Sequence, residues 1–340
     1  MALDTSRKAS IQHALDQYRQ TVFARNMSLL PILVDKIEAA KIPNSWDGQR
    51  VHKARMRALN NYFAHPLGGD EIGDTISSLQ DLLILTPTSR FAERFYLDGT
   101  SHKPVDLASV TDYFNTLRQA LLSKRSSKDP ALQDSEYPEE PPEDLEYLMS
   151  LVSSVVAPKM ECDYGSRPST FFPTESHDLE VHAPVRIGHT EDSSLDVFDP
   201  YEYAWEDWTI AVAINIGEQH PDWSPSGVHA LYCSPNTEGE RKDWRWRYGI
   251  TEKYYSSELY DSVEDFLLKF WLHFDEETEE NVRSALISLD PEGDIIASCK
   301  RNGAEEVVVR PGDPGHHGGE KDEIWIVEPS DPRHSAYRNE

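Results

Sequence analysis

Apolar and polar positions alternate most regularly between Trp205 and Phe274. Within Trp208–Ile216 every second residue is a large apolar one, and Thr, Ala and Asn occupy the positions between them. Because side chains alternate between the two faces of a strand, the pattern predicts a strand with one apolar face. The small residues opposite favour a central position in a sheet. The next apolar run, Val228–Cys233, is expected to pair with this strand.

A third run, Trp244–Ile250, alternates strictly. It places its Trp, Tyr and Ile residues on one face and Arg245 and Arg247 on the other. We therefore predict a strand whose arginine face meets water.

A capped helix is predicted directly after these three strands. Ser262 is a suitable N-cap, and Asp265 follows it by three residues, as in a capping box with Asp in place of Glu. Large apolar residues then recur at spacings of three and four as far as Phe274, which predicts one apolar stripe. Such a stripe has to be buried against the sheet, because each large side chain contributes about 1.5–3 kcal/mol when it is fully buried.

The first third of the chain has helical periodicity and no strand alternation. Helices are predicted over residues 5–42, with a break near Asn26, and over Gln49–Phe63, Thr75–Leu85 and Val105–Leu122. The helix over Gln49–Phe63 has a basic outer face with Lys53, Arg55 and Arg57. The helix over Val105–Leu122 has Val110, Phe114, Leu117 and Leu121 as its apolar stripe. This part is expected to be an all-α region.

Composition divides the chain further. We expect a helical N-terminal region at 1–124, a polar and proline-bearing linker at 125–141, an α+β domain at 142–328 and a disordered tail at 329–340. The α+β domain is expected to open with a helix that starts at Pro142 and has Leu145, Leu148, Met149 and Val152 along one face. A short helix is expected at Asn281–Leu289. Several weaker strand signals remain, and periodicity does not decide whether the last three form a small meander or join the main sheet: Ser169–Phe172, Val181–Ile187, Ile295–Ser298, Val307–Arg310 and Ile324–Val327. The expected fold class is α+β, an antiparallel sheet flanked by helices and preceded by helices.

The order of these segments resembles the SUKH superfamily, which includes fungal cell-wall-assembly regulators of the Knr/Smi type and bacterial toxin-immunity proteins. The resemblance rests on Pro142-Glu-Asp-Leu-Glu-Tyr-Leu148, the Trp-rich strand region Trp205–Ile216, the short strand Val228–Cys233, and Tyr260-Asp-Ser-Val-Glu-Asp-Phe-Leu267. It covers about residues 139–275. The resemblance implies an α+β domain without catalytic residues that binds other proteins as a regulatory scaffold.

Charge is distributed very unevenly along the chain. Residues 1–128 contain 17 Lys+Arg and 13 Asp+Glu, whereas the remainder contains 16 and 47, and the net charge is -27. Such an acidic surface repels nucleic acid and anionic membranes, since both are bound through Lys and Arg. Binding to a basic protein partner is still possible, although the acidic surface can also serve only to keep the protein soluble and monomeric. No apolar run is long enough to span a membrane, and the start lacks a signal peptide, so a cytoplasmic protein is expected.

The residues with metal or nucleophile chemistry show no compact motif. Cys162, Cys233 and Cys299 form no CxxC pair, which fits a reducing compartment, and each is interpreted as a buried thiol. A metal-dependent enzyme is the alternative function, and its candidate ligands are His177, His182 and His189 with Glu175, Glu191 and Asp192. Their spacing matches no known ligand pattern, and His316-His317 lies in a Gly-Pro-rich loop. We therefore predict no cofactor, no metal and no catalytic residue.

Four residues are the candidates for contact with a partner protein. Trp205 and Trp223 lie outside the regular pattern, whereas Trp208, Trp244 and Trp246 are assigned to the core by alternation. Arg245 and Arg247 lie on the face expected to be wet, where they either orient an anionic group of a partner or pair with local carboxylates. The sequence thus predicts a non-enzymatic protein-interaction or regulatory scaffold module, with its partner and oligomeric state open.

Overall fold

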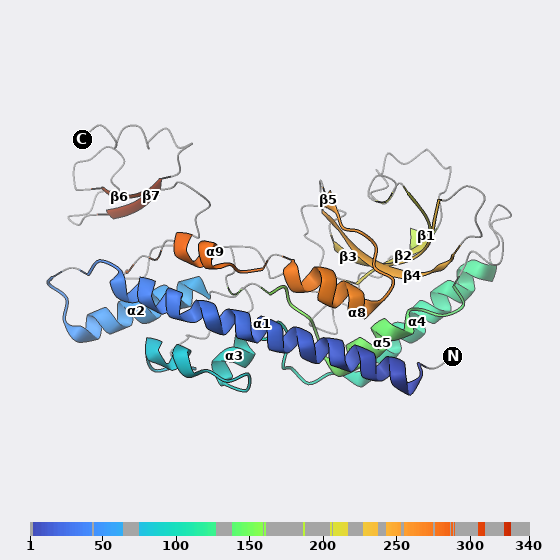
Figure 1. The fold of residues 1–340 in the computed structure, drawn as a ribbon, viewed down its shortest axis with the longest axis horizontal. Coiled ribbons are helices and arrows are strands. Elements are labelled where there is room, and N and C mark those ends of the chain that lie inside the picture. The colour runs from blue at the N-terminus through green and yellow to red at the C-terminus, as the bar shows by residue number, and fades with distance from the viewer. Residues whose placement is uncertain are drawn as a thin grey trace. The chain divides into compact units, whose positions relative to one another are not determined.

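The chain folds into helices and antiparallel sheet, which confirms the predicted α+β class (Figure 1). The structure is a computed structural model. The residues it describes are 3–42, 44–63, 75–126, 138–158, 160, 186–187, 205, 207–216, 227–236, 243–252, 255–274, 276–285, 287, 289, 305–309 and 323–327.

Two compact units make up the chain, and the division between them falls within the first helix, after Asn26. The first unit comprises residues 1–26, 86–160 and 168–276, and the second comprises 27–85, 161–167 and 277–340. Each unit therefore combines segments that are far apart in the sequence.

The first unit contains a five-stranded antiparallel sheet with the strand order β1-β2-β3-β4-β5. Its strands are β1 (Arg186–Ile187), β2 (Trp208–Asn215), β3 (Gly227–Pro235), β4 (Arg245–Glu252) and β5 (Tyr255–Ser256). The three long strands match the three predicted runs. β2 lies between β1 and β3, so its predicted central position and its pairing with the second run are both confirmed.

A β-bulge changes the predicted face of β2. The register with β3 shifts between Ile210 and Val212, which leaves Ala211 as an extra residue on β2. Val212, Ile214 and Ile216 join the main core, whereas Trp208 and Ile210 pack against a second cluster, formed by Trp205, Ala213, Leu231 and Cys233. The prediction of one apolar face along the whole of Trp208–Ile216 was therefore wrong.

The first helix, α1 (Thr5–Ala39), is continuous, so the break predicted near Asn26 was wrong. Asn is a weak helix former partly because its side chain bonds to nearby backbone in other conformations. Here the Asn26 side chain is buried, and its Nδ2 donates instead to the carbonyl oxygen of Leu97 at 2.9 Å. A tertiary hydrogen bond thus engages the side-chain nitrogen of Asn26, so it is not available to the local backbone.

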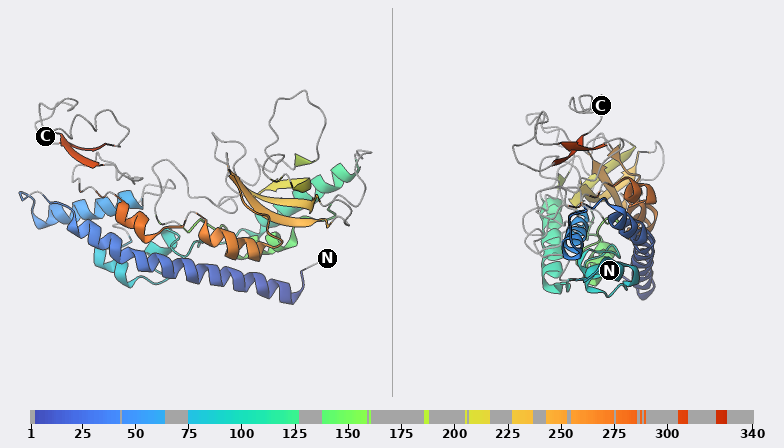
Figure 2. Two further views of the ribbon diagram at one scale, coloured as in Figure 1. Left: turned by 45° about the horizontal axis from the view of Figure 1, so that its top comes forward. Right: turned by 90° about the vertical axis from the view of Figure 1, so that its left-hand side faces the viewer.

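The first unit has three further helices, of which the first was not predicted and the other two follow predicted stripes. They are α3 (Arg90–Arg94), α4 (Leu107–Ser126) and α5 (Glu143–Leu151), and α4 and α5 lie side by side (Figures 1 and 2). The predicted inner positions of the last two are all buried: Val110, Phe114, Leu117 and Leu121 on α4, and Leu145, Leu148 and Met149 on α5, followed by Val152.

The capped segment after the sheet has the predicted cap but not a uniform α-helix. Ser262 Oγ accepts a hydrogen bond from the backbone N–H of Asp265 at 3.1 Å, which confirms the N-cap. One α-helical turn, α8 (Val263–Asp265), is followed by a π-helical turn, η4 (Phe266–Phe270), and a 3-10 turn, η5 (Trp271–His273). Phe266 and Trp271 are buried nonetheless. Sequence periodicity does not distinguish these helix types, because the wider and tighter turns keep the same residues facing inward.

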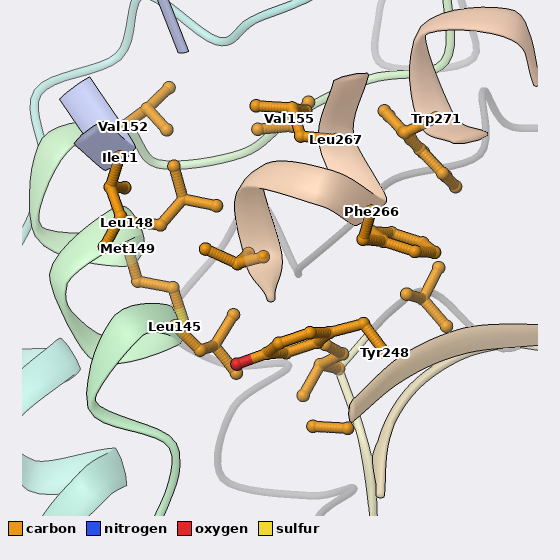
Figure 3. Packing of buried hydrophobic residues seen from close by; sticks show 14 of the residues in the cluster. Ile11, Leu145, Leu148, Met149, Val152, Val155, Tyr248, Phe266, Leu267 and Trp271 are labelled. Atoms are coloured by element: carbon orange, nitrogen blue, oxygen red, sulfur yellow. The ribbon is translucent and has the colours of Figure 1, made fainter. Parts of the chain in front are cut away.

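One hydrophobic core joins the N-terminal helices to the sheet. Side chains from α1, α5, β4 and α8–η5 converge in it, among them Ile11, Leu145, Tyr248 and Phe266 (Figure 3). The predicted linker at 125–141 lies between parts of this core in the sequence, so residues on both sides of it share one hydrophobic interior. The predicted tail at 329–340 and the candidate strands at Ser169–Phe172 and Ile295–Ser298 lie outside the described residues.

The second unit contains the rest of α1, then α2 (Gly48–Tyr62), the 3-10 helix η2 (Leu79–Ile84) and α9 (Glu279–Ser284). α2 agrees with the predicted helix Gln49–Phe63, while the longer helix predicted at Thr75–Leu85 is the short η2. β6 (Glu305–Val309) and β7 (Glu323–Val327) pair only with each other in a two-stranded sheet. This answers the question left open by periodicity, since neither strand is part of the five-stranded sheet.

Candidate functional site

Arg247 lies beneath the surface of the sheet, so its predicted exposure was wrong. Its side chain is only 2% exposed. Nε donates to Oδ1 of Asp261 at 2.7 Å, and Nη1 donates to the carbonyl oxygen of Cys233 at 2.7 Å. Nη2 lies 3.2 Å from Oδ2 of Asp243, and the guanidinium carbon lies 4.5 Å from the ring centroid of Trp208. A desolvated guanidinium requires such partners. Two of them are carboxylates close in the sequence, so Arg247 pairs with local carboxylates, which was the predicted alternative to contact with a partner protein.

Arg245, two residues earlier on the same face, remains accessible. Its side chain is 48% exposed and forms ion pairs with Asp243 and, at 3.4 Å, with Oδ2 of Asp261. The two aspartates are therefore shared by the two arginines. Because Arg247 fixes both carboxylates from below, the guanidinium of Arg245 is held at the surface in a defined place.

Trp205 is a structural residue and not an exposed contact, which corrects the prediction. It is 5% exposed, and its Nε1 donates to the carbonyl oxygen of Ser257 at 2.8 Å. Its ring also lies so close to Gly249 that an added Cβ there would be 2.9 Å from Trp205 Cζ2. Trp205 is therefore buried even though it lies outside the regular alternation of apolar residues. The fourth candidate, Trp223, lies outside the described residues.

An aromatic cluster, which we define as Tyr232, Trp244 and Trp246, lies on β3, on β4 and directly before β4, on the face of the sheet opposite to Arg245. The Tyr232 and Trp244 rings are stacked, with centroids 5.8 Å apart, and Tyr232 and Trp246 meet edge to face at 5.5 Å. All three residues are partly exposed. Alternation assigned Trp244 and Trp246 to the core, but Trp246 is at the margin of the core, where its Nε1 donates to the carbonyl oxygen of Glu140 at 3.0 Å.

Acidic groups adjoin the aromatic cluster. Burial and, to a lesser degree, the nearby Glu139 carboxylate raise the pKa of the Tyr232 hydroxyl, so this group stays neutral at physiological pH. Glu140 is held by Arg118, whose Nε lies 2.9 Å from Glu140 Oε2. The cluster therefore combines apolar ring surface with fixed charges of both signs.

A polar junction that no sequence pattern predicted joins four elements. The Tyr248 hydroxyl on β4 donates to Oδ1 of Asp144 on α5, and the backbone N–H of Val263 donates to Oδ2 of the same carboxylate at 3.3 Å. Arg7 on α1 lies 2.8 Å from Oε2 of Glu264 and 3.7 Å from Asp144. Burial, followed by the charge of Asp144, raises the pKa of Tyr248 well above its ordinary value. The tyrosine therefore stays protonated and serves as a hydrogen-bond donor that positions α5 on the sheet.

A second buried carboxylate organises the turn before α4. Asp98 accepts hydrogen bonds from the backbone N–H and the hydroxyl of Thr100, at 3.0 and 3.1 Å, and lies 3.0 Å from Nε2 of His102. The hydrogen bond to Asp98 is the main cause that raises the pKa of His102 above its ordinary value. Glu93, 4.0 Å from the other ring nitrogen, acts in the same direction.

The described residues hold no grouping that points to metal or thiol chemistry. Among them no three His, Cys, Asp or Glu residues are placed so that they could bind a metal ion. Cys233 is a free, buried thiol, and burial raises its pKa to about 11, so it is not a reactive thiolate at neutral pH. The other candidate residues lie outside the described part of the chain: Cys162, His177, His182, His189, Cys299 and His316-His317.

Comparison with protein-family models, with curated proteins and with solved structures found no match to this chain. In the part of the chain that the structure describes, no helix has the length and apolar character needed to cross a bilayer.

Proposed function

We propose that this protein is a non-enzymatic protein-interaction module that acts as a regulatory scaffold in the cytoplasm. The observation that carries the proposal is the partly exposed aromatic cluster of Tyr232, Trp244 and Trp246. The exposed guanidinium of Arg245 is held on the opposite face of strand β4. Tyr, Trp and Arg are the residues that most often dominate the binding energy of protein interfaces.

The cluster suits a binding surface because it is rigid before any partner arrives. Tyr232 and Trp246 are directly opposite each other on neighbouring strands, and backbone pairing between β3 and β4 fixes both. On the opposite face of β4, Arg245 is likewise held in place, by Asp243 and Asp261. Ordering side chains on binding costs about 0.5–1.5 kcal/mol for each flexible residue, so a surface that is already ordered retains more of its contact energy.

The charge of the chain favours protein over nucleic acid or membrane as the partner. A net charge of -27 opposes any ligand whose binding depends on phosphate neutralisation. The resemblance of residues 139–275 to the SUKH superfamily agrees with this choice, since it implies protein binding in the manner of the Knr/Smi-type regulators. The antiparallel sheet followed by the Ser262-capped helix is compatible with that resemblance.

Affinity capture with the full chain tests the proposal. We expect a specific protein to bind the parent and to be lost with Trp244→Ala/Arg245→Ala. The matched control is Tyr147→Ala/Lys269→Ala, which removes one partly exposed aromatic residue and one exposed cation of the same unit. Retention of the partner by the first variant would contradict the assigned surface. Stoichiometric zinc or iron in the purified protein, together with turnover of a small molecule, would overturn the proposal in favour of the metal-enzyme alternative.

A further inference from the structure

The outward face of α2 in the second unit is a stripe of positive charge. Arg50, Lys53 and Arg57 follow one another at i, i+3 and i+7, so they lie along one side of the helix. Arg50 and Lys53 are exposed and Arg57 is partly exposed. The helix contains no Asp or Glu in its 15 residues, and its opposite side is buried through Ala54, Ala58, Leu59 and Tyr62.

The carboxylates nearest to α2 in its own unit have other functions. Asp47 Oδ1 accepts a hydrogen bond from the backbone N–H of Arg50 at 2.8 Å and so caps the start of the helix. The carboxylate of Glu38 accepts from the side-chain amide of Gln80 at 3.0 Å, and Arg55 donates to the carbonyl oxygen of Glu38. Within the described residues, Lys53 and Arg57 form no ion pair.

The stripe weakens the helix that carries it. Like charges three or four residues apart on a helix repel each other, and here Lys53 has such a neighbour on each side. The chain as a whole is strongly acidic, so a concentration of cations on one helix face departs from its general charge balance. The guanidinium carbon of Arg50 lies 4.9 Å from the ring centroid of Trp46, which leaves the repulsion between Lys53 and Arg57 in place. A local arrangement that lowers stability is typical of a functional surface.

We propose that the stripe formed by Arg50, Lys53 and Arg57 binds an acidic segment of a partner protein. The positive charge of the stripe indicates an acidic ligand. The length of the stripe indicates the length of the bound segment, because seven residues of helix span about 10 Å. The segment therefore carries at least three carboxylates within about that length. Arginine and lysine together suit this ligand, since arginine forms bidentate contacts with carboxylates and lysine contributes a point charge. The surface is separate from the aromatic cluster and does not depend on it.

A titration of the full-length protein with a labelled peptide tests this. The probe is a fluorescein-labelled peptide of 16 residues in which Glu and Ala alternate, and binding is followed by fluorescence anisotropy at 50 and 200 mM salt. We expect Arg50→Gln/Lys53→Gln/Arg57→Gln to bind at least tenfold more weakly than the parent, and parental binding to weaken as salt rises. The control Lys103→Gln/Lys269→Gln/Arg283→Gln changes the net charge equally, and it should bind like the parent, as should Trp244→Ala/Arg245→Ala.

Circular dichroism shows whether the variant is still folded. Because the substitutions remove mutual repulsion, the helix content should be retained, and the single exposed substitution Lys53→Glu provides a second test with less change to the helix. Equal affinity of the parent and both variants would overturn the proposal. So would equal binding of a peptide in which Lys and Ala alternate, or tighter stripe-dependent binding of a 16-nucleotide RNA or of vesicles containing phosphatidylserine.

Discussion

Nε of Arg247 lies 2.7 Å from Oδ1 of Asp261, the residue directly before the N-cap Ser262. This contact links strand β4 to the start of α8 through a guanidinium that is almost completely buried. The sheet and the helix that covers it are thus joined by a charged pair as well as by apolar packing.

Removal of the Arg247 side chain should therefore be costly. Arg247→Ala leaves the buried ends of its partners without a donor, and breaking a buried pair costs about 3–5 kcal/mol, with the lower end expected here because Asp261 is half exposed. Arg245→Ala should cost less than about 1 kcal/mol, since its ion pairs are at the surface. Urea denaturation followed by tryptophan fluorescence measures both. Similar losses for the two variants would contradict the assignment of Arg247 to the interior and Arg245 to the surface.

Stability should fall as pH rises through the titration of His102. Its folded pKa is raised above the ordinary value by the hydrogen bond to Asp98, so protonation favours the folded state. The contribution is fully present below the unfolded pKa of about 6.5 and is lost as pH rises through the higher folded pKa. Proton NMR should give a raised pKa for His102 in the parent and a lower one in Asp98→Asn. Denaturation at pH 5.5 and 8.5 should show a larger difference for the parent than for His102→Gln.

Equal pH dependence of the parent and His102→Gln would contradict this prediction. The comparison of two proteins that differ only at residue 102 removes the contribution of every other titratable group. Arg19 also lies near Asp98, with its Nε 3.9 Å from Oδ2, and its positive charge opposes the effect of the carboxylates on His102.

Substitution of Gly99 should destabilise the first unit. Gly99 has φ +74°, and an added Cβ would lie 2.6 Å from the Tyr18 ring, whose hydroxyl donates to the carbonyl oxygen of Val156. Gly99→Ala combines left-handed backbone strain with this collision, and we expect a loss of about 2 kcal/mol or more. Gly48→Ala is the matched control, because nothing lies within 4 Å of its added Cβ. Thermal denaturation should show little change or a slight gain for the control, and equal losses would be inconsistent with the role of Gly99.

The Ser262 cap should be measurable by itself. Ser262→Ala removes the acceptor for the Asp265 N–H, and the loss of an N-cap costs about 0.5–2 kcal/mol. Ser262→Asp restores an acceptor and should recover most of the stability. Denaturant midpoints of the three proteins provide the measurement. A loss that Asp does not recover would show that packing around the serine, and not the cap, is responsible.

Local patterns predicted the elements well where one physical rule dominated. The alternation in Trp244–Ile250 and the spacing of Leu145, Leu148 and Met149 identified a strand and a helix, because burial selects the same face at every position. The Ser262 cap was also predicted, since capping needs only residues that are adjacent in the sequence.

What the sequence did not predict depends on distant partners. Alternation gave the face of Arg247 correctly but not its burial, which depends on Asp261 and on Trp208 across the sheet. Similarly, Trp246 is partly exposed because it lies where the covering layer ends, and periodicity does not report where another element stops. For the candidate site, Arg245 was recognised, whereas the stack of Tyr232 on Trp244 required the register of β3 and the segment that leads into β4.

The extra residue in β2 also determines how the charged centre of the sheet is covered. In a regular strand without the bulge, with Ala211 paired in register, Trp208 would project to the same side as Val212, into the main core. With the bulge, Trp208 projects to the opposite side, where its ring lies over the Arg247 guanidinium. A regular strand would therefore leave the Arg247 guanidinium without the Trp208 ring, and carboxylates cannot supply the cation–π contact that this ring makes. The bulge reverses the alternation of side chains along β2, and the Trp208 ring covers the buried guanidinium of Arg247 as a result.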